Sequence, residues 1–389
     1  MQLKSKVPFI TALSVVAINV LFCYFVYSLS FLPAFEKVKE DRMDQVIKQI
    51  DSLLHEYRIS AASLADLLAE RNALKELVLM GDREGIIKLL QPTYSTQHDR
   101  YGMEILSIIQ SPAKMLVRMH KLEKFGDDAS TRNMVITTSS QQKTVSGVEI
   151  ASSGLGIRAI SPLKQDGKSI GLVEVGLGFN ELITETKDTT GFEIAVFVKQ
   201  SLLAEIATNL PPPESDDLIG GMRALYRSDW KKIRSAVSAD LLRNVQDTVM
   251  LSKKVEGKST GIVMTPLADF SGQAIGVIVA VREFKKTQML EDKFFLDILS
   301  LVAVQIILLS SFIFIIFRGW ISRPLSDLAS CLASLNQNEE TQKAGLDSID
   351  RLLNRKDEVG DIARQLEEYI KKRPLNENDE KGLKKGGRS

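Results

Sequence analysis

Two long uncharged runs constrain this chain more than any other feature of its sequence. No charged side chain occurs from Val7 to Phe35, and none occurs from Ile298 to Phe317. Each run supplies the roughly 20 apolar residues that a helix needs to cross a bilayer. We therefore expect two transmembrane helices, at residues 7–34 and 294–317.

The basic residues beside these runs predict their orientation. Lys4 and Lys6 precede the first run and Arg318 and Arg323 follow the second, whereas the two inner ends carry mixed charges. This positive-inside bias places both termini in the cytoplasm, and we expect a multi-pass protein of a bacterial inner membrane. The first run is longer than the apolar core of a signal peptide and lacks a clear cleavage site, which favours an uncleaved anchor.

The segment between the runs is large and free of cysteine. Cys23 lies in the first run and Cys331 beyond the second, so no disulfide can form outside. About 260 exported residues are enough for two modules of ordinary size. Folding of both modules must then rest on burial alone.

A long stalk helix is predicted to open the exported segment. Its apolar residues follow heptad spacing, interrupted at Ser60 and Arg71 and ended by Gly81-Asp82. The seam residues are Met43, Val46, Ile50, Leu53, Tyr57, Leu64, Leu67, Leu74 and Val78. Such a stripe packs on its own domain, pairs with a second copy, or does both along different parts of its length.

After the stalk, strand-like and turn-like stretches alternate in two passes. Period-2 and β-branched patterns predict the strands, and Ser153-Gly154 and Asp166-Gly167 predict hairpin turns. The first pass has strands at 101–109, 114–120, 147–150, 156–162 and 169–176 and a helix at 127–141, and the second has strands at 192–198, 249–255, 261–267 and 273–282 with a helical stretch at 202–245. Each pass ends with an apolar strand that carries a glycine, at Gly171 and at Gly276, which indicates a structural repeat.

A stalk helix and two α+β modules between membrane helices resemble the double Cache sensor of bacterial chemoreceptors and sensor kinases. The residues that carry the resemblance are Arg118, His120, Phe125-Gly-Asp-Asp128, Arg132, Gly147-Val-Glu149, Gly154-Leu-Gly156-Ile-Arg158 and Gly171-Leu-Val-Glu174. The resemblance implies that the membrane-distal module binds a ligand between its sheet and its long loops. The pattern of amino-acid-binding Cache domains cannot be placed, because Trp230 is the only exported tryptophan.

The expected ligand-binding residues are polar and mostly cationic. They are Tyr101, Arg118, His120, Arg132, Glu149, Arg158 and Glu174. A guanidinium pairs two carboxylate or phosphate oxygens at once, which predicts a small anionic ligand. The alternatives stay open: the carboxylates neutralise the arginines, Arg158 and Glu174 form a cross-strand ion pair, and Asp127 and Asp128 cap a helix.

Residues 318–371 resemble a HAMP relay domain. Arg323-Pro324 opens one short helix, a polar connector follows from Asn336 to Ala344, and Asp357-Glu358 opens a second helix. The relay residues are Pro324, Leu328, Leu332, Leu335, Glu358, Val359, Ile362 and Leu366. Helices this short are marginal alone, so we expect a parallel coiled-coil bundle of four helices in a homodimer.

The remaining sequence carries no sign of catalysis. His120 is the last histidine and the chain ends at Ser389, so we expect no phosphoacceptor histidine, ATPase or cyclase in the cytoplasmic part. We expect no enzyme activity, no cofactor, no metal site and no nucleic-acid partner. The output is then expected from a cytoplasmic partner, a kinase or a chemoreceptor signalling unit. Two alternatives are an output-less modulator that forms mixed dimers with full-length receptors, and the sensor half of a split histidine kinase.

The expected fold class is therefore α+β, in a transmembrane sensor with a stalk helix, two PAS-like Cache modules and a cytoplasmic HAMP bundle. The expected domains are a cytoplasmic N-terminus (1–6), a first transmembrane helix (7–34), the stalk (35–80), the distal module (81–183), the proximal module (184–290), a second transmembrane helix (294–317), the HAMP domain (318–371) and a disordered tail (372–389).

Overall fold

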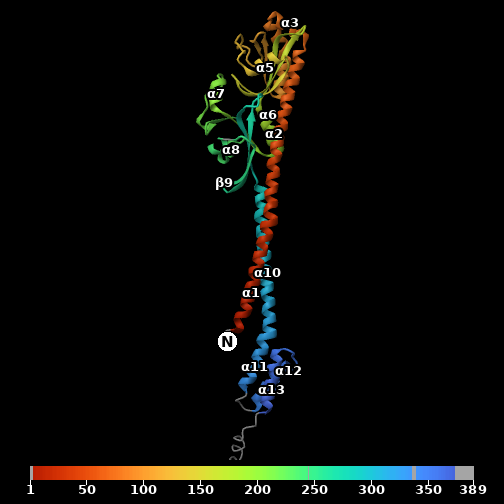
Figure 1. The fold of residues 1–389 in the computed structure, drawn as a ribbon, viewed down its shortest axis with the longest axis vertical. Coiled ribbons are helices and arrows are strands. Elements are labelled where there is room, and N and C mark those ends of the chain that lie inside the picture. Colours follow the sequence, from red (N-terminus) through yellow and green to blue (C-terminus); the bar gives the residue numbers. More distant parts are fainter. Residues whose placement is uncertain (1–2, 244, 335–338, 373–389) are drawn as a thin grey trace, which may run out of the picture. The chain divides into compact units, whose positions relative to one another are not determined.

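The computed structural model describes residues 3–243, 245–334 and 339–372. Two compact units result, one of Leu32–Glu291 and the other of Met1–Phe31 together with Asp292–Ser389 (Figure 1). The first unit holds both α+β modules, and the second holds the ends of the chain.

Three helices open the first unit. Helix α2 (Leu32–Ala69) is followed by α3 (Asn72–Met80) and α4 (Arg83–Tyr101). Gly81 ends α3 in the left-handed conformation, with φ 66°, and the carboxylate of Asp82 accepts a hydrogen bond from the Gly85 amide to cap α4. The expected single stalk helix is thus broken near Arg71, where its apolar seam was already interrupted.

The distal sheet is antiparallel, in the order β2-β1-β5-β4-β3. Its elements are β1 (Met103–Gln110), β2 (Lys114–Arg118), α5 (Asn133–Gln141), β3 (Val145–Ala151), β4 (Gly154–Gln165) and β5 (Lys168–Leu177). The predicted turn at Asp166-Gly167 joins β4 to β5, and both of its residues have positive φ. A two-residue loop of this kind suits the twist of a hairpin.

The proximal sheet has the order β7-β8-β6-β11-β10-β9. Its elements are α6 (Phe179–Thr190), β6 (Glu193–Lys199), α7 (Gln200–Ile206), η2 (Ser215–Asp217), β7 (Leu218–Ile219), β8 (Met222–Arg227), α8 (Trp230–Ala236), α9 (Ala239–Leu242), β9 (Val249–Val255), β10 (Lys258–Ala268) and β11 (Ala274–Glu283). The expected helical stretch at 202–245 is wrong in its middle, where β7 and β8 form a hairpin. Gly220 and Gly221 both have positive φ, and this pair turns the chain.

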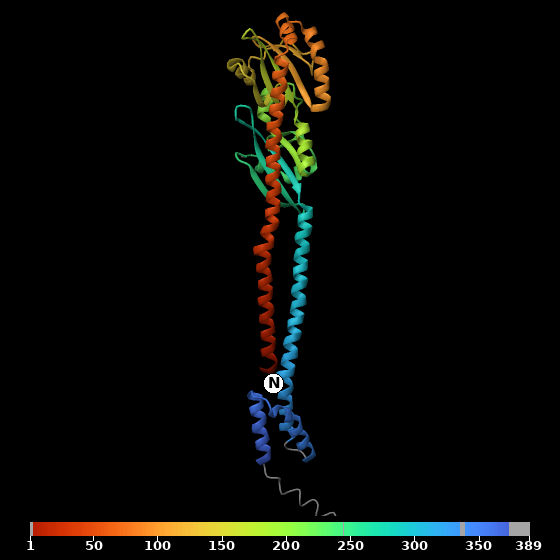
Figure 2. The same cartoon turned by 90° about the vertical axis from the view of Figure 1, so that its right-hand side faces the viewer.

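Helix α2 packs along both sheets (Figures 1 and 2). The stripe of Met43, Val46, Ile50 and Leu53 is buried as expected, but Leu67 is 67% exposed. Further along the helix the buried positions are Ala61, Ala65, Leu68 and Ala69. A straight α-helix drifts away from a strict heptad, so a face packed on its own domain moves on by one residue.

The two glycine-bearing strands are equivalent in structure. A Cβ on Gly171 would lie 2.4 Å from the Ile109 carbonyl oxygen, and one on Gly276 would lie 2.1 Å from that of Phe197. Each glycine thus lets its strand approach the backbone of the neighbouring strand. The same close backbone approach occurs at a glycine in the equivalent strand of both sheets, which agrees with the predicted structural repeat.

The second unit contains the two apolar helices. Helix α1 (Leu3–Val26) is followed by a π-helical turn, η1 (Tyr27–Phe31), and α10 (Lys285–Phe317) is followed by another, η3 (Arg318–Ser322). By length and composition alone, both helices are able to cross a membrane. Aromatic contacts join η1 to α10, with 5.1 Å between the ring centroids of Phe31 and Phe294.

The C-terminal part of this unit has three helices, α11 (Arg323–Ser334), α12 (Glu339–Leu353) and α13 (Glu358–Lys372). The expected polar connector at 336–344 is wrong from Glu339 onward, because α12 begins there. Ile349 and Leu352 recur at helical spacing and pack against Leu328 and Cys331.

The buried faces of α11 and α13 also differ in phase from the predicted seams. Leu328 and Leu366 are buried as predicted, but Leu332 is 53% exposed next to buried Cys331, and Ile362 is exposed next to buried Ala363. Predicted Leu335 lies outside the described residues. Within one chain the described helices bury only part of the predicted seams, and the dimeric four-helix bundle stays a prediction.

Candidate functional site

Strand register brings the candidate residues to one face of the distal sheet. Glu174 on β5 lies opposite Ser107 on β1 and Ile160 on β4, and Ser107 lies opposite Arg118 on β2. Side chains two residues apart share a face of a strand. Arg158 therefore projects on the same side as Glu174, as does Glu149, which lies opposite Gly156 on β4.

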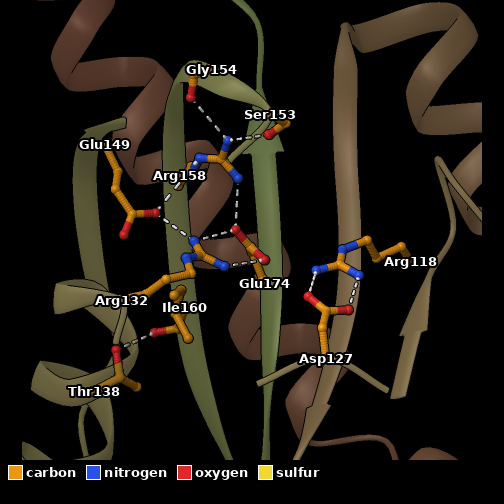
Figure 3. A network of polar contacts seen from close by, with 10 residues as sticks. All are labelled: Arg118, Asp127, Arg132, Thr138, Glu149, Ser153, Gly154, Arg158, Ile160 and Glu174. Carbon is orange, nitrogen blue, oxygen red and sulfur yellow. Dashed lines mark hydrogen bonds and ion pairs between the residues drawn. The ribbon is translucent and has the colours of Figure 1, made fainter. Parts of the chain in front are cut away.

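Two arginines and two glutamates form a buried ionic network on this face (Figure 3). Arg132 donates to both Glu174 oxygens, at 3.0 and 2.7 Å, and to Glu149. Arg158 donates to Glu174 at 2.8 Å and to the Ser153 hydroxyl at 2.9 Å. The side chains of Arg158 and Glu174 are only 3% and 2% exposed.

Opposite charges in this network favour the ionised forms of Glu174 and Arg132. Burial by itself would raise the pKa of Glu174, but the adjacent charges of Arg132 and Arg158 outweigh it and hold that pKa well below its usual range. Burial likewise opposes the charge of Arg132, and Glu174 and Glu149 raise its pKa. At neutral pH Glu174 is therefore negatively charged and Arg132 is positively charged.

The loop before α5 supplies a second ion pair. Arg118 donates from both terminal nitrogens to Asp127, each at 2.6 Å, and stands apart from the four-residue network (Figure 3). The expected helix at 127–141 begins only at Asn133. Asp127 and Asp128 therefore do not cap it: Asp127 pairs with Arg118, and Asp128 accepts bonds from Ser130 in a turn.

Several polar atoms of this face lack a hydrogen-bond partner among the described residues. They are Ser107 Oγ, His120 Nδ1, Arg132 Nε and Arg158 Nε. Ser107 is 1% exposed. Burial lowers the pKa of His120 to about 4, so its imidazole is neutral at neutral pH.

These residues line one cavity of about 800 Å³. Its other wall comes from the proximal module, through α7, the segment after it and the turn between β10 and β11. This wall includes Asn209, Asp269, Phe270 and Gln273. A cavity of this size falls within the range of small-molecule sites.

Direct bonds hold the two walls together. The Phe270 amide donates to the Val148 carbonyl at 2.9 Å, and Lys124 donates to the Asn209 side chain at 2.9 Å. Phe270 also packs closely on Gly147: a Cβ added to Gly147 would lie 2.6 Å from the Cβ of Phe270. The cavity is therefore a shared product of both modules.

Six of the seven predicted binding residues line the cavity, and Tyr101 does not. Tyr101 ends α4 and is 61% exposed. Each predicted arginine is paired with a carboxylate, which is the alternative that the sequence left open. The sequence analysis did not identify Ser107, although the alternation of side chains along its strand places it on the same face as Glu174. It also did not identify the proximal wall of the cavity, because no local sequence pattern indicates that wall.

Comparison with known proteins gives three kinds of result. Residues 39–287 match the dCache_3 family, described as the double sensory domain of two-component sensor kinases. No curated protein matches the chain.

Similar solved structures are bacterial sensor domains at low identity. The ligand-binding domain of the Campylobacter jejuni chemoreceptor Tlp3, in complex with 4-methylisoleucine, is 13% identical, with 65% of this chain and 93% of that chain covered and a TM-score of 0.37. The periplasmic domain of Vibrio cholerae LuxQ is 12% identical, with 63% and 99% covered and a TM-score of 0.36. The ligand-binding domain of the Pseudomonas fluorescens chemoreceptor CtaA, in complex with L-isoleucine, is 16% identical, with 66% and 98% covered and a TM-score of 0.36.

The family match spans more than half of the chain and includes both sheets and the cavity between them. This chain therefore belongs to the dCache_3 family of double sensory domains of two-component sensor kinases.

Proposed function

We propose that this protein is a membrane receptor that binds a small molecule in the cavity between its two sensory modules. The observation that carries the proposal is the buried network of Arg132, Arg158, Glu149 and Glu174 in the wall of an 800 Å³ cavity. Buried charges are costly to a fold. Their concentration on a concave wall is better explained by recognition of a ligand than by stability.

The path of the chain supplies a route for the signal. Gln273 and Ile275 belong to the cavity wall, and β11 runs from there to Glu283, directly before α10. In the proposed receptor α10 crosses a bacterial inner membrane, with the sensory modules outside. A ligand that favours one arrangement of this wall would bias the position of α10, provided that it binds the two arrangements with different affinity.

The receiving element is proposed to be a HAMP-type relay formed by α11 to α13 in a homodimer. The apolar faces of these helices and the Asp357 cap, which accepts from the Gly360 amide at 3.1 Å, support this proposal. Residues 318–389 contain no histidine. We propose that a kinase or a chemoreceptor signalling unit receives the signal from this relay.

The test is ligand binding by the full chain in lipid nanodiscs. Thermal unfolding would be followed against a library of small metabolites of every charge class, since a ligand that binds only the folded state raises Tm. Arg118→Met and Arg158→Met are expected to weaken binding at least about tenfold, because each removes a polar wall residue. Arg100→Met, an exposed position on α4 away from the cavity, is the matched control. Binding that is equally strong in all three variants would remove the cavity assignment.

A further inference from the structure

The segment 152–155, which joins β3 to β4, is held by hydrogen bonds from two sides. On the side of the cavity, Arg158 donates to the Ser153 hydroxyl at 2.9 Å and to the Gly154 carbonyl at 3.4 Å (Figure 3). The same guanidinium donates to Glu174 at 2.8 Å. The 152–155 segment therefore helps to fix the position of one arginine of the ionic network.

The proximal module holds the two outer residues of the same segment. The Asn209 amide donates to the Ser152 carbonyl at 2.9 Å, and the Tyr226 hydroxyl donates to the Leu155 carbonyl at 2.8 Å. Four successive residues thus accept hydrogen bonds, the inner two from Arg158 and the outer two from the proximal module. Because the four acceptors are joined by a few covalent bonds, a displacement of Arg158 strains the contacts with the proximal module, and the reverse also holds.

Tyr226 contacts this segment from a packed position. Its ring centroid lies 5.4 Å from that of Phe179, and the ring packs against an apolar core cluster. Burial raises the pKa of Tyr226 above its usual range, so the hydroxyl keeps its hydrogen at neutral pH. Tyr226 does not line the cavity. Its hydroxyl contacts the 152–155 segment, and that segment contacts Arg158.

Strand register connects Tyr226 to the strand that precedes α10. Tyr226 on β8 lies opposite Val196 on β6, and Val196 lies opposite Ile278 on β11. Val196 and Ile278 are buried in the cluster on which the Tyr226 ring packs. Directly opposite side chains of neighbouring strands are in contact. One row of side chains therefore runs from the 152–155 segment to β11, which ends at Glu283, two residues before α10 begins.

We propose that Tyr226 is a positioning residue for the cavity: through the 152–155 segment it fixes Arg158, and the same contacts carry a change at Arg158 to β11. The inference rests on the proposed function, because it takes the cavity as the ligand site, but it holds for a ligand of any charge. Energetic coupling between two sites is reciprocal. A perturbation at either end of this path must then be detectable at the other end.

The test is hydrogen exchange, followed by mass spectrometry, of the full chain in nanodiscs without ligand. Ser153→Ala removes one acceptor of Arg158, and we expect amides of β8 to exchange at least about twofold faster. Tyr226→Phe removes only the hydroxyl, and we expect the same acceleration in β4 around Arg158. Strand β9, at the far edge of the proximal sheet, should keep its rate in both variants. A substitution that only destabilised the fold would accelerate exchange in β9 as well.

Matched controls are Ser140→Ala, at an exposed position on α5, and Tyr94→Phe, on α4; neither residue lines the cavity. Both controls should leave β4 and β8 unchanged. Ser153→Ala and Tyr226→Phe together should accelerate exchange by less than the product of their separate effects, because they interrupt one path. Acceleration confined to the segment around each substitution, or a combined effect equal to the product, would overturn the inference and leave the receptor function intact. Reciprocal changes together with an empty ligand screen would support the coupling and reject the receptor function.

Discussion

At the scale of single residues, burial of the ionic network costs free energy, and each of its charges depends on a partner that stays in place. Removing four charged side chains from water is expensive, and the attraction between them largely offsets that cost without a large net gain. Loss of one partner is different, because it strands a charge in a buried place. Arg158 and Glu174, both almost fully buried, are the pair for which this asymmetry is strongest.

Replacement of Arg158 by methionine should therefore destabilise the sensory domain by about 3–5 kcal/mol. The measurement is denaturant unfolding of the domain in the full chain. Lys48→Met is the matched control, because it breaks a pair with Asp44 in which both side chains are at least half exposed, and pairs of that kind contribute little. Equal losses in the two variants would show that the network is not buried as described.

His120 should make stability depend on pH. Its pKa falls from 6.5 to about 4 on folding, so between these values the unfolded chain binds a proton that the folded chain does not. Stability is then complete above about pH 6.5 and decreases as pH falls toward 4. Between pH 7 and pH 5 the loss should be about 2 kcal/mol.

His120→Gln should remove this dependence, and His55→Gln, at an exposed position on α2, should retain it. The groups that act on His120 are Glu174, Arg158, Arg118 and Lys121. Glu174 does not affect this comparison between pH 7 and pH 5. Its pKa is lowered on folding, so its contribution to the free energy of unfolding is lost only as pH falls below about 4.5. An identical pH profile for His120→Gln and the unaltered chain would exclude a buried neutral imidazole.

At the scale of secondary-structure elements, Phe270 packs closely on Gly147 where the two modules meet. A Cβ at Gly147 would approach the Phe270 backbone to 2.8 Å, so Gly147→Ala must push the β10–β11 turn away. We expect a loss of about 1–3 kcal/mol in unfolding free energy. Gly156→Ala, in the neighbouring strand, is the control, since its Cβ would lie no closer than 3.6 Å to any neighbour. A Gly147→Ala protein as stable as Gly156→Ala would contradict the described contact.

Elements whose signal is local could be predicted from the sequence. The strands of the distal sheet and the turn at Asp166-Gly167 follow from alternation and from turn chemistry, and the structure confirms them. Gly220-Gly221 has the residue types of a hairpin turn, but the sequence analysis did not predict this hairpin. The reason is that the flanking strands are too short to show a clear alternation. The sequence does not predict the start of helix α12, because its first residues form a long polar interval that is typical of a connector.

Partners that meet only after folding were not predictable in the same way. The pairing of Arg132 with Glu174 joins residues 42 positions apart, across a loop whose course no sequence pattern fixes. The residues of the network were therefore identified correctly, while their mutual neutralisation stood as one alternative among several. The proximal wall of the cavity forms only when the two modules pack together, so no local sequence pattern predicts it.

At the scale of the whole molecule, helix α2 and the cavity both connect the two modules of the sensory unit. Helix α2 contributes to the apolar cores of both modules, and the cavity has walls from both. A change in the cavity thus acts on two modules that both pack on α2, and β11 leads from one wall towards α10. For such a change to reach a partner, the C-terminal helices need a second packing arrangement, which a dimer provides.

The dimer is tested most directly at Leu332. This residue belongs to the predicted seam of α11, yet it is exposed in the single chain, so the dimer model predicts that a second copy covers it. In a full chain with Cys23→Ser and Cys331→Ala, Leu332→Cys should give crosslinked dimers in native membranes under mild oxidation. Ser330→Cys is the matched control, because two residues along a helix place it on nearly the opposite face. Equal crosslinking at both positions would indicate random collision, and monomers at both would exclude a parallel α11 pair. Selective capture at Leu332 would show that this apolar face is an interface between two copies, as a relay that works by repacking a helical bundle requires.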